Sequence, residues 1–376
     1  MTVSPLAALT GAVVPDGASL PSHYGNPFQE EELLANAAQS FTDLSTIEIL
    51  EVSGQDRMNW LHNITTCDFH GLNPGDSSEL LVLDANGHIE HAAGVYVGDE
   101  AVYLLCDEGR SAALADFLNS MRFMLRVEVT PQPELAAIGV VGDMLDSLEK
   151  LVELTEFTWV DPWPGSEGDE GSIHPHYGVN WAKHPGLGWG LRVIVMDREN
   201  LLATARALVA AGHKPVGTIA FEAHRITSWR PRPNAEIVER VLPHELDWLR
   251  SAVHVTKGCY RGQETVAKLV NLGRPPRRLV YLYLEGPETD LPEAGTPVTV
   301  GEKTVGFVTS SARSWADGPV ALAVVKRSTA PDAVLTAGAF VAGQQEIVSA
   351  EGKSSVSPTE RPGAGLRRIK PTEGLL

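Results

Sequence analysis

A strand, a glycine turn and a helix occur twice in the first two thirds of the chain, and each time a strand, an aspartate and a second helix follow. The first copy has its turn at Gly54 and its aspartate at Asp107, and the second has them at Gly142 and Asp197. The two intervals, 53 and 55 residues, nearly agree. This period predicts two α/β units built alike, although two matching devices can also coincide by chance.

Hydrophobic periodicity and turn residues place the elements of these units. We expect strands at 47–52, 79–83, 89–97, 101–106, 127–129, 135–141 and 191–196, and helices at 54–63, 109–121, 143–153, 200–211 and 221–228. Asp107 and Asp197 precede helical patterns, so both are predicted helix caps. The Pro-, Gly- and Trp-rich segment 161–190 is predicted to be irregular, either a functional lid or an insertion.

The pattern changes after Pro275-Pro276 to short alternating runs at 278–284, 297–300, 304–309 and 321–325. Runs of this kind, separated by Gly, Pro and Asp, predict a small antiparallel barrel or sandwich. From Ser349 onward the chain is rich in Gly, Pro, Ser and charge, so a disordered tail is expected. The predicted domains are an N-terminal tail (1–24), two α/β domains (25–130 and 131–274), a C-terminal barrel (275–348) and this tail (349–376).

The length of 376 residues exceeds one ordinary core, and 43% hydrophobic with 21% charged residues is typical of a globular protein. Neither a membrane-spanning stretch nor the basic and apolar regions of a signal peptide are evident, so we expect a cytoplasmic protein. The three cysteines are an odd number without metal-ligand spacing. They fit a reducing compartment and argue against a disulfide frame or an all-protein zinc or iron-sulfur site.

Basic residues are concentrated in one part of this acidic chain, whose net charge is −18. Between Arg225 and Arg278 there are eleven Lys or Arg residues against five Asp or Glu residues. A basic patch on an acidic protein usually faces an anionic ligand, and the alternative is a solvated basic face.

The octet Lys257-Gly258-Cys259-Tyr260-Arg261-Gly262-Gln263-Glu264 combines a thiol with cations, an amide and a carboxylate. Its two glycines predict that Cys259 lies on a tight, exposed turn. The run Thr265–Val270 after it could be a helix or a strand. If it is a helix, its N-terminal amides, together with Lys257 and Arg261, would lower the Cys259 pKa. The alternative is a structural turn in which the cysteine is an ordinary small hydrophobic residue.

Several catalytic motifs are missing from the sequence. It contains no G-x-x-x-x-G-K-[ST] loop, no G-x-G-x-x-G after a strand, no H-E-x-x-H and no G-x-S-x-G. These absences argue against P-loop, Rossmann, zincin and serine-hydrolase functions. His174-Pro175-His176 lacks an evident third ligand, so we predict no metal site there.

The octet KGCYRGQE resembles the signature of the YgfZ family, folate-binding relatives of the glycine-cleavage T protein. Weaker similarities occur in the same order along residues 45–325: Ser53–Leu61 with Asn63–Asp68, Leu83–Ile89, and Val305–Ser310. The resemblance implies an α+β fold of the GcvT-like type, with two related ferredoxin-like α/β units and a small antiparallel β-barrel closing into a three-domain ring. It also implies a tetrahydrofolate site at the centre of the ring.

Folate is a flat pterin with an anionic tail, so its site needs an aromatic slot, polar groups and cations. We expect Trp229, Arg230 and Arg232, with Tyr260 and Arg261, to supply these parts, although simple core packing is the alternative for Trp229. The predicted catalytic residue is Cys259, and the predicted cofactor-binding residues are Lys257, Tyr260, Arg261, Gln263, Glu264, Arg225, Thr227, Trp229 and Arg230.

Two positions depart from the family pattern. The carboxylate that carries aminomethyl transfer in the T protein is matched here by His91 and Ala92, which argues against that activity. The glutamate of the family's R-I-E-A-G segment, which contacts the pterin, is matched by Thr227. We therefore expect folate binding to be weak, altered or lost.

The leading hypothesis is a YgfZ-type protein that binds tetrahydrofolate or a derivative. It would use Cys259 to assist iron-sulfur cluster assembly or repair on client enzymes, such as tRNA-thiolating enzymes. One cysteine cannot hold a stable cluster, so any cluster would be transient or shared with a partner. The alternatives are a folate-dependent aminomethyltransferase or other one-carbon transferase, and an RNA-binding module that uses the basic residues.

Overall fold

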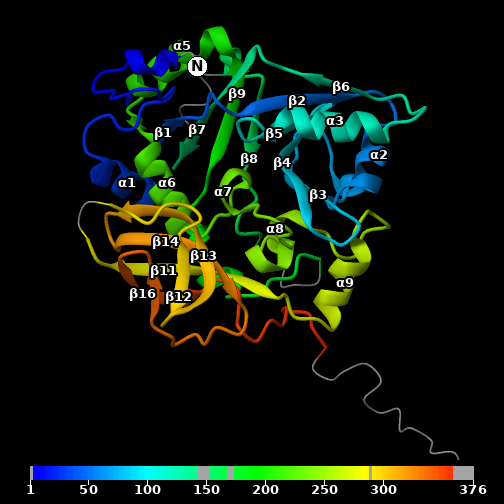
Figure 1. Cartoon of the computed structure of the whole chain (residues 1–376). Helices are drawn as coiled ribbons and strands as arrows, with labels where there is room; N and C mark the ends of the chain where they lie inside the picture. The colour runs from blue at the N-terminus through cyan, green and yellow to red at the C-terminus, as the bar shows by residue number, and fades with distance from the viewer. Residues whose placement is uncertain (1–2, 143–151, 167–172, 288–289, 359–376) are drawn as a thin grey trace, which may run out of the picture.

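The computed structural model describes residues 3–142, 152–166, 173–287 and 290–358. The described strands form two open five-stranded sheets and a closed barrel (Figure 1). In order across the first sheet they are β3 (Ser77–Leu83), β4 (Ile89–Val97), β5 (Ala101–Cys106), β2 (Glu48–Ser53) and β6 (Glu128–Pro131). Across the second sheet they are β10 (Lys214–Val216), β1 (Ser40–Asp43), β7 (Leu135–Val141), β9 (Arg192–Asp197) and β8 (Phe157–Val160).

The two sheets share one plan, as the repeat predicted. In the first sheet, β2 lies between β5, the strand before the second helix, and β6, the strand after it, which is the ferredoxin-like arrangement. In the second sheet, β7 pairs with β9, the strand before the second helix, but β1 lies between β7 and β10, the strand after that helix. The second sheet differs by one added strand, because β1 pairs antiparallel with β7 and parallel with β10. Residues 40–43, which precede the first unit, therefore belong to the sheet of the second unit.

Both faces of each sheet are buried, which explains why the strands read as nearly continuous apolar runs. In β2, Leu50 and Val52 pack under α2 (Arg57–Ile64) and α3 (Ser111–Met121), whereas Ile49 faces the second sheet. In β7, alternate residues likewise pack under α5 (Leu201–Ala210) or face the first sheet. Each buried aliphatic side chain contributes roughly 1.5–3 kcal/mol, so the central layer between the sheets is the main apolar core.

Gly94 of β4 marks a close approach between the two units. A Cβ atom at this position would lie 2.8 Å from the Cε2 atom of the Trp159 ring. Trp159, on β8, donates its Nε1–H to the carbonyl of Ser78 at 2.7 Å. The tryptophan thus joins the sheets, and only glycine leaves room for its ring.

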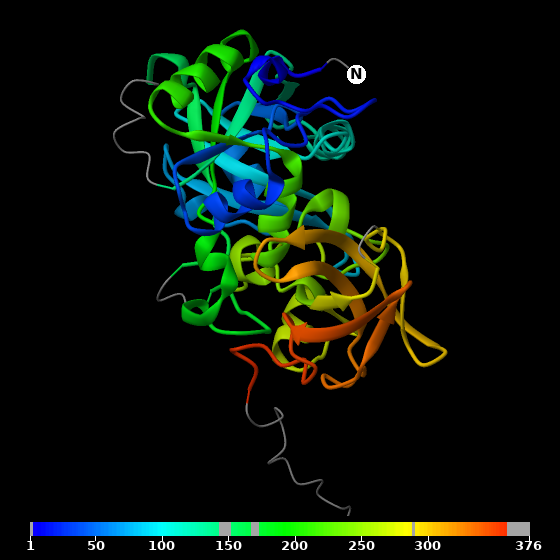
Figure 2. The same ribbon diagram turned by 90° about the vertical axis from the view of Figure 1, so that its left-hand side faces the viewer.

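The barrel predicted after Pro276 is confirmed and is closed. Its strands run in the order β11 (Arg277–Glu285), β14 (Gly318–Lys326), β13 (Lys303–Ser314), β12 (Pro297–Val300), β15 (Leu335–Ala337) and β16 (Phe340–Glu346). Closure leaves no unpaired edge, and the alternate residues that point inward form a separate core. The barrel lies at one end of the molecule, below both sheets (Figures 1 and 2).

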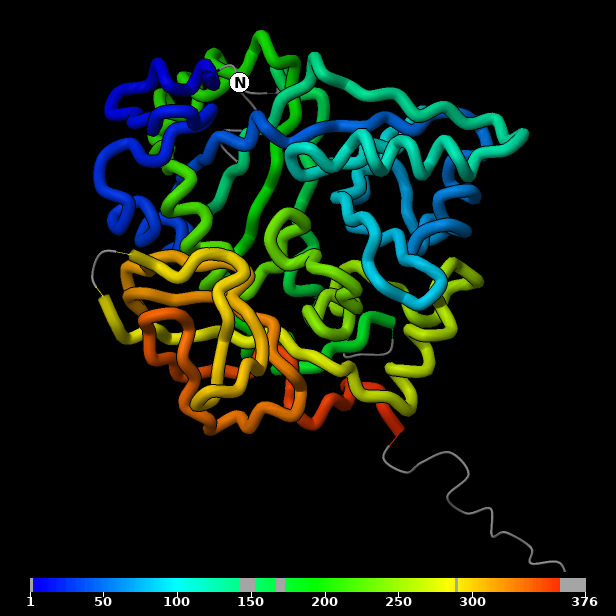
Figure 3. Tube along the Cα trace, in the orientation of Figure 1, coloured from blue at the N-terminus to red at the C-terminus, as the bar shows by residue number. Residues whose placement is uncertain are grey.

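The remaining helices connect these parts: α1 (Pro27–Ala35), α6 (Thr218–Thr227), α7 (Pro233–Glu236), α8 (Leu249–Ala252) and α9 (Gln263–Asn271). The chain passes through α7 and α8 in the middle of the molecule before it reaches α9 (Figure 3). None of the described helices is long and apolar enough to cross a membrane.

The structure differs from the sequence-based expectations at several points. Leu6, in the expected N-terminal tail, is fully buried against α5. Residues 349–358, expected to be disordered, are described, and there Ser354 and Ser357 donate to the carbonyl of Val270. The remainder of that tail lies outside the described residues, as does most of the predicted helix 143–153.

Both predicted aspartate caps are wrong, because neither side chain bonds to the helix that follows. The residue at the N-terminal end of α3 is Arg110, which makes no side-chain cap. The Ser111 amide instead donates to Glu48, and the Asp107 carboxylate accepts from Arg232 and Asn234. At Asp197 the side chain likewise makes no capping bond. The turn glycines Gly54 and Gly142 are confirmed at positive φ, 103° and 93°.

A buried carboxylate, Glu236 at the end of α7, holds α6 to the barrel. It is fully buried and accepts hydrogen bonds from the Arg225 guanidinium (3.0 Å), Thr309 (2.9 Å) and Ser310 (2.7 Å). Its partners come from a helix and a strand that are far apart in the sequence. Loss of this carboxylate would leave the buried guanidinium of Arg225 only partly neutralised.

We predict that Glu236→Ala lowers the free energy of unfolding by about 3–5 kcal/mol, because it breaks a buried ion pair from one side. Urea unfolding followed by tryptophan fluorescence measures this change. Glu239→Ala is the matched control, because the Glu239 side chain is 90% exposed, and its effect should stay within about 0.5 kcal/mol. Equal effects of the two substitutions would contradict the role assigned to Glu236.

Candidate functional site

A cavity of about 660 Å³ lies where the two sheets, α6 and the barrel strand β13 meet. Its size is within the range of small-molecule sites, and such sites usually lie between domains. Aromatic side chains from all sides of this junction line it: Trp159 from β8, Trp189 before β9, Phe221 from α6, and Trp248 before α8. The rings of Trp189 and Phe221 lie 5.3 Å apart. The cavity thus offers flat apolar surfaces suited to an aromatic ligand.

Two buried carboxylates at the cavity are bound to one arginine. Arg230 donates from Nη2 to Glu79 at 2.7 Å and from Nε to Asp161 at 3.0 Å. Glu79 also accepts from the Trp248 indole at 3.0 Å, and Asp161 accepts from the Trp189 indole at 2.7 Å. The carboxylates raise the pKa of Arg230 despite its burial, which favours the neutral form. These groups shape the wall and are already neutralised.

A second charged group is more open to the cavity. Glu222 accepts from Arg225 at 2.9 Å and 2.5 Å, and its side chain is 29% exposed. Burial raises the pKa of Glu222, but Arg225 and the more distant Arg232 outweigh it and hold the pKa below its usual value. The Arg232 side chain is 40% exposed and contacts Asp107 at 3.1 Å. An accessible carboxylate and an accessible guanidinium therefore face the same cavity.

The position matched to the T-protein acid also lies in the cavity wall. Ala92 of β4 lines the cavity, whereas its neighbour His91 points the other way and contacts Phe117 of α3 at 5.8 Å between ring centroids. Burial lowers the pKa of His91. Neither residue supplies a carboxylate to the cavity, in line with the expectation from the sequence.

Two predicted contact residues do not reach the cavity. Thr227 donates its hydroxyl to the carbonyls of Ala223 and His224 in its own helix. Trp229 is buried in the main core and packs edge-on against His184 at 5.3 Å. Trp229 therefore packs in the core, which is the alternative that the sequence left open for it. Of the predicted cofactor-binding residues, Arg225 and Arg230 line the cavity.

The octet 257–264 forms a second, separate feature, because none of its residues lines the cavity. The run after it is a helix, α9, and Gly262 precedes this helix with φ at 82°. A Cβ atom on Gly262 would lie 2.6 Å from the carbonyl oxygen of Asp84. The loop therefore packs on the turn between β3 and β4. Ala92 lies farther along β4.

The Lys257 side chain points inward and caps α2. Its ammonium donates to the carbonyl oxygens of His62, Thr65 (2.6 Å) and Cys67 (2.8 Å). Burial lowers the pKa of Lys257 to about 8, against the opposing effect of Cys67 and Asp68. The ammonium also lies 5.1 Å from the Tyr260 ring. Lys257 thus anchors the loop to the first unit.

Other residues of the octet have structural partners as well. Arg261 donates to Glu90 at 2.8 Å, and Gln263 donates to the Lys257 carbonyl at 3.5 Å. Tyr260 is buried, and its hydroxyl has no hydrogen-bond partner among the described residues. Glu264 is exposed in the first turn of α9. These residues would contact folate only if it bound outside the central cavity.

The three cysteines differ in exposure. Cys259 is exposed, as predicted, whereas Cys67 and Cys106 are buried. Burial raises the pKa of the Cys67 thiol to about 11 and that of Cys106 further. Cys259 is therefore the thiol that a partner or reagent in solution can reach.

Nearly half of the cations in the basic segment do not reach the surface. Five of its eleven cations are buried: Arg225, Arg230, Arg250, Lys257 and Arg278. Most of these are paired with carboxylates or backbone carbonyls, as Arg250 is with Asp247. Both the predicted patch and the solvated-face alternative are wrong for these residues, because their charges serve to join domains.

The described residues of the segment 161–190 contain no strand or α-helix, only two short 3-10 helices at Trp181–Lys183 and Pro185–Gly188, and they pack into the main core through Trp163, Tyr177 and Trp189. The segment carries Asp161 and Trp189 to the cavity. We predicted no metal site at His174 and His176. Each of these side chains contacts a backbone carbonyl, at 3.0 Å and 3.1 Å.

Sequence reasoning missed most of the cavity wall, including Glu79, Trp159, Trp189, Phe221, Glu222 and Trp248. One signal was available, because Glu222 and Arg225 are three residues apart on a predicted helix and could pair there. The tryptophans gave no such signal, because their convergence depends on how the two sheets face each other.

The sequence and the fold are similar to those of several known proteins. Residues 277–355 match the family model of the glycine cleavage T-protein C-terminal barrel domain. The chain is 28% identical to a protein of Arabidopsis thaliana named as a chloroplastic transferase, over 71% of this chain and 60% of that protein. It is 25% identical to an aminomethyltransferase of Streptomyces avermitilis over 89% of this chain and 91% of that protein.

It is also 25% identical to the tRNA-modifying protein YgfZ of Yersinia pseudotuberculosis, over 83% of this chain and 92% of that protein. Among solved structures, it is similar to the glycine cleavage system aminomethyltransferase T of Bartonella henselae, with a TM-score of 0.68 and 18% identity. That match covers 93% of this chain and 97% of the other. The chain therefore has a GcvT-like α+β fold with a C-terminal six-stranded antiparallel barrel, and this barrel matches the T-protein barrel family.

Proposed function

We propose that the chain binds tetrahydrofolate or a derivative in the central cavity and does not use it for aminomethyl transfer. The observation that carries the proposal is the cavity itself, which lies at the junction of the three parts and combines aromatic walls with an accessible carboxylate. Related proteins named aminomethyltransferases support a folate ligand, because aminomethyl transfer uses tetrahydrofolate.

The residues present fit such a ligand. A pterin ring needs flat apolar surfaces, which Trp159, Trp189 and Phe221 offer. Its amino and ring N–H groups need an acceptor, and Glu222 has lone pairs left after its bonds to Arg225. An anionic tail needs a cation, and Arg232 is the guanidinium with an exposed side chain in the wall. When bound, the folate would supply its one-carbon chemistry, and the chain would bind and shield it.

A true aminomethyltransferase or other one-carbon transferase is the first alternative, and the named relatives favour it. Ala92 argues against it, because it places a methyl group where the T protein has its carboxylate. The buried carboxylates Glu79 and Asp161 cannot replace that group while Arg230 and two indoles occupy their oxygens. Production of methylene-tetrahydrofolate from an aminomethyl donor by the purified chain would establish this alternative instead.

We predict that calorimetric titration with 5-formyltetrahydrofolate gives saturable binding with one site per chain. Glu222→Gln should weaken it about 10-fold or more, because a hydrogen bond to a charged group contributes about 1.5–3 kcal/mol. Arg232→Ala should weaken polyglutamylated folate more than folate with one glutamate. Glu239→Gln, which alters an exposed carboxylate away from the cavity, serves as the control. Unchanged affinity in both cavity variants would place the ligand elsewhere.

We further propose that Cys259 serves iron-sulfur cluster assembly or repair on client enzymes, such as tRNA-thiolating enzymes. The exposed thiol favours this function, because Lys257 and the turn at 84–88 hold its loop on the surface. Similarity to the tRNA-modifying protein YgfZ supports it. Any cluster or its iron and sulfur would be cargo. The cytoplasmic location stays a prediction, because named relatives include chloroplastic and mitochondrial proteins.

Cys259→Ser should leave the fold and folate binding unchanged and should lower the activity of iron-sulfur enzymes in cells that depend on this protein. Cys106→Ser is the matched control, because that thiol is buried. Labelling of the native protein with a thiol reagent should modify one cysteine, and none in Cys259→Ser. Full client activity in cells carrying Cys259→Ser would sink this part of the proposal.

The RNA-binding alternative has little support from the structure, because five of the cations that suggested it are buried. It still predicts an affinity for RNA that falls steeply with salt. A flat response, or no binding at low salt, would remove it.

A further inference from the structure

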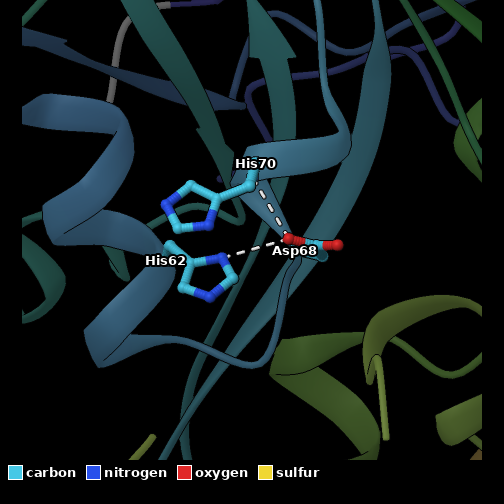
Figure 4. A group of neighbouring side chains, drawn as sticks. All are labelled: His62, Asp68 and His70. Atoms are coloured by element: carbon cyan, nitrogen blue, oxygen red, sulfur yellow. Dashed lines mark hydrogen bonds and ion pairs between the residues drawn. The ribbon is translucent and has the colours of Figure 1, made fainter. Parts of the chain in front are cut away.

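Two imidazoles and a carboxylate gather beside the cysteine loop and have no part in the proposed function. His62 lies in the last turn of α2, and Asp68 and His70 follow a few residues later. Their side chains converge in Figure 4, where the two rings lie face to face and each turns a nitrogen toward the carboxylate. One ligand atom from each of the three lies within 4.8 Å of the other two.

The local backbone explains this convergence. Asp68 caps the short 3-10 helix Phe69–Gly71 by accepting the His70 amide at 3.1 Å. The Lys257 ammonium holds the carbonyl of His62 and the carbonyls at 65 and 67 together, which turns the chain back at the end of α2. The backbone that carries the three side chains is thus held at one corner of the fold.

Hydrogen bonding does not account for the buried imidazole. His62 is only 6% exposed, and its Nδ1 lies 3.1 Å from an Asp68 oxygen. This nitrogen nevertheless lacks a hydrogen bond of acceptable geometry among the described residues. Its ring stacks on His70 at 3.8 Å between centroids with a 10° angle. Its contact with Asp68 is thus an ion pair of poor hydrogen-bond geometry, and a buried polar atom of this kind calls for an explanation such as an ion.

We propose that His62, Asp68 and His70 form a binding site for a divalent first-row transition-metal ion. Two imidazoles and one carboxylate are the donor set that iron(II) and zinc sites use, and open positions remain for water or a further ligand. To bind the ion, the exposed imidazole of His70 must turn out of its stack with His62. It then gives up its contact with Asn59 at 3.3 Å. His62 needs no such change of exposure.

The surroundings support a cation at this corner. The other Asp68 oxygen lies 3.7 Å from His254 Nε2, which places a third imidazole next to the carboxylate. Asp68 therefore has a fixed orientation and can neutralise part of the charge of the ion.

The site lies directly under the loop that carries Cys259. A Cβ atom on Gly258 would stand 3.7 Å from the His62 Nε2. An ion bound here would therefore lie between the first unit and the loop that carries the exposed thiol. The inference itself depends on the three side chains and does not require that Cys259 be reactive or that folate bind.

The test is a titration of the full-length protein, prepared without a histidine tag and stripped of metal, with Co²⁺ as the probe. Visible absorption reports the ligands of Co²⁺, and competition with a chromophoric chelator gives the Zn²⁺ affinity. We expect one equivalent to bind. His70→Ala and Asp68→Asn should each weaken binding about 100-fold or more, beyond the 10–100-fold that loss of an outer partner costs.

His88→Ala is the matched control, because His88 contacts Asp84 at 2.9 Å in a similar surface pair outside the proposed set, and it should leave the affinity unchanged. Circular dichroism must show that each variant is folded. Absence of stoichiometric binding by the wild type overturns the proposal, as does equal affinity in His70→Ala and Asp68→Asn. Loss of binding in Cys259→Ser alone would place the ion on the thiol and would also overturn it.

Discussion

Two buried arginines at the end of α6 hold the three parts of the molecule together. Arg230 binds Glu79 of the first sheet and Asp161 of the second unit, while Arg225 binds Glu222 and Glu236 and reaches Ser310 of the barrel at 2.9 Å. A buried guanidinium is costly unless it is neutralised, so each domain must bring its oxygen atoms to the same place. The cavity forms around these bonds, which explains why its walls come from every domain.

The same requirement limits the chemistry of the cavity. Glu79 and Asp161 are not available as acids or bases, because they neutralise Arg230, and Ala92 brings no carboxylate to the cavity wall. Accessible groups in the wall include the exposed Glu108, the partly exposed Glu222 and Arg232, and the aromatic faces. These groups suit a flat ligand with an anionic tail.

The exposed thiol lies at another place, on the loop around Cys259. Lys257 is the link between this loop and the first unit, because it replaces the missing partners of three carbonyls at the end of α2. The β3–β4 hairpin carries both features, since its turn supports the loop and Ala92 of β4 faces the cavity. The β3–β4 hairpin thus connects the wall of the cavity with the loop that carries the exposed thiol.

Local signals in the sequence predicted the fold well. Nearly continuous apolar runs located the strands of the two units, whose sheets are buried on both faces, and alternating runs located those of the barrel, where burial on one face leaves a period of two. The added strand β1 and the contacts of the two arginines depend on the tertiary structure, so no local pattern indicated them. Lys257 and Trp229 show the limit for the site: their positions beside a cysteine and an arginine suggested ligand contacts, but both side chains point into the protein.

The most direct test of the account is a crystal structure of the chain grown with 5-formyltetrahydrofolate. The account predicts electron density for the pterin among Trp159, Trp189 and Phe221, with Glu222 as a hydrogen-bond partner and the tail near Arg232. Density against the 257–264 loop with an empty cavity would contradict it, as would an empty cavity at saturating ligand.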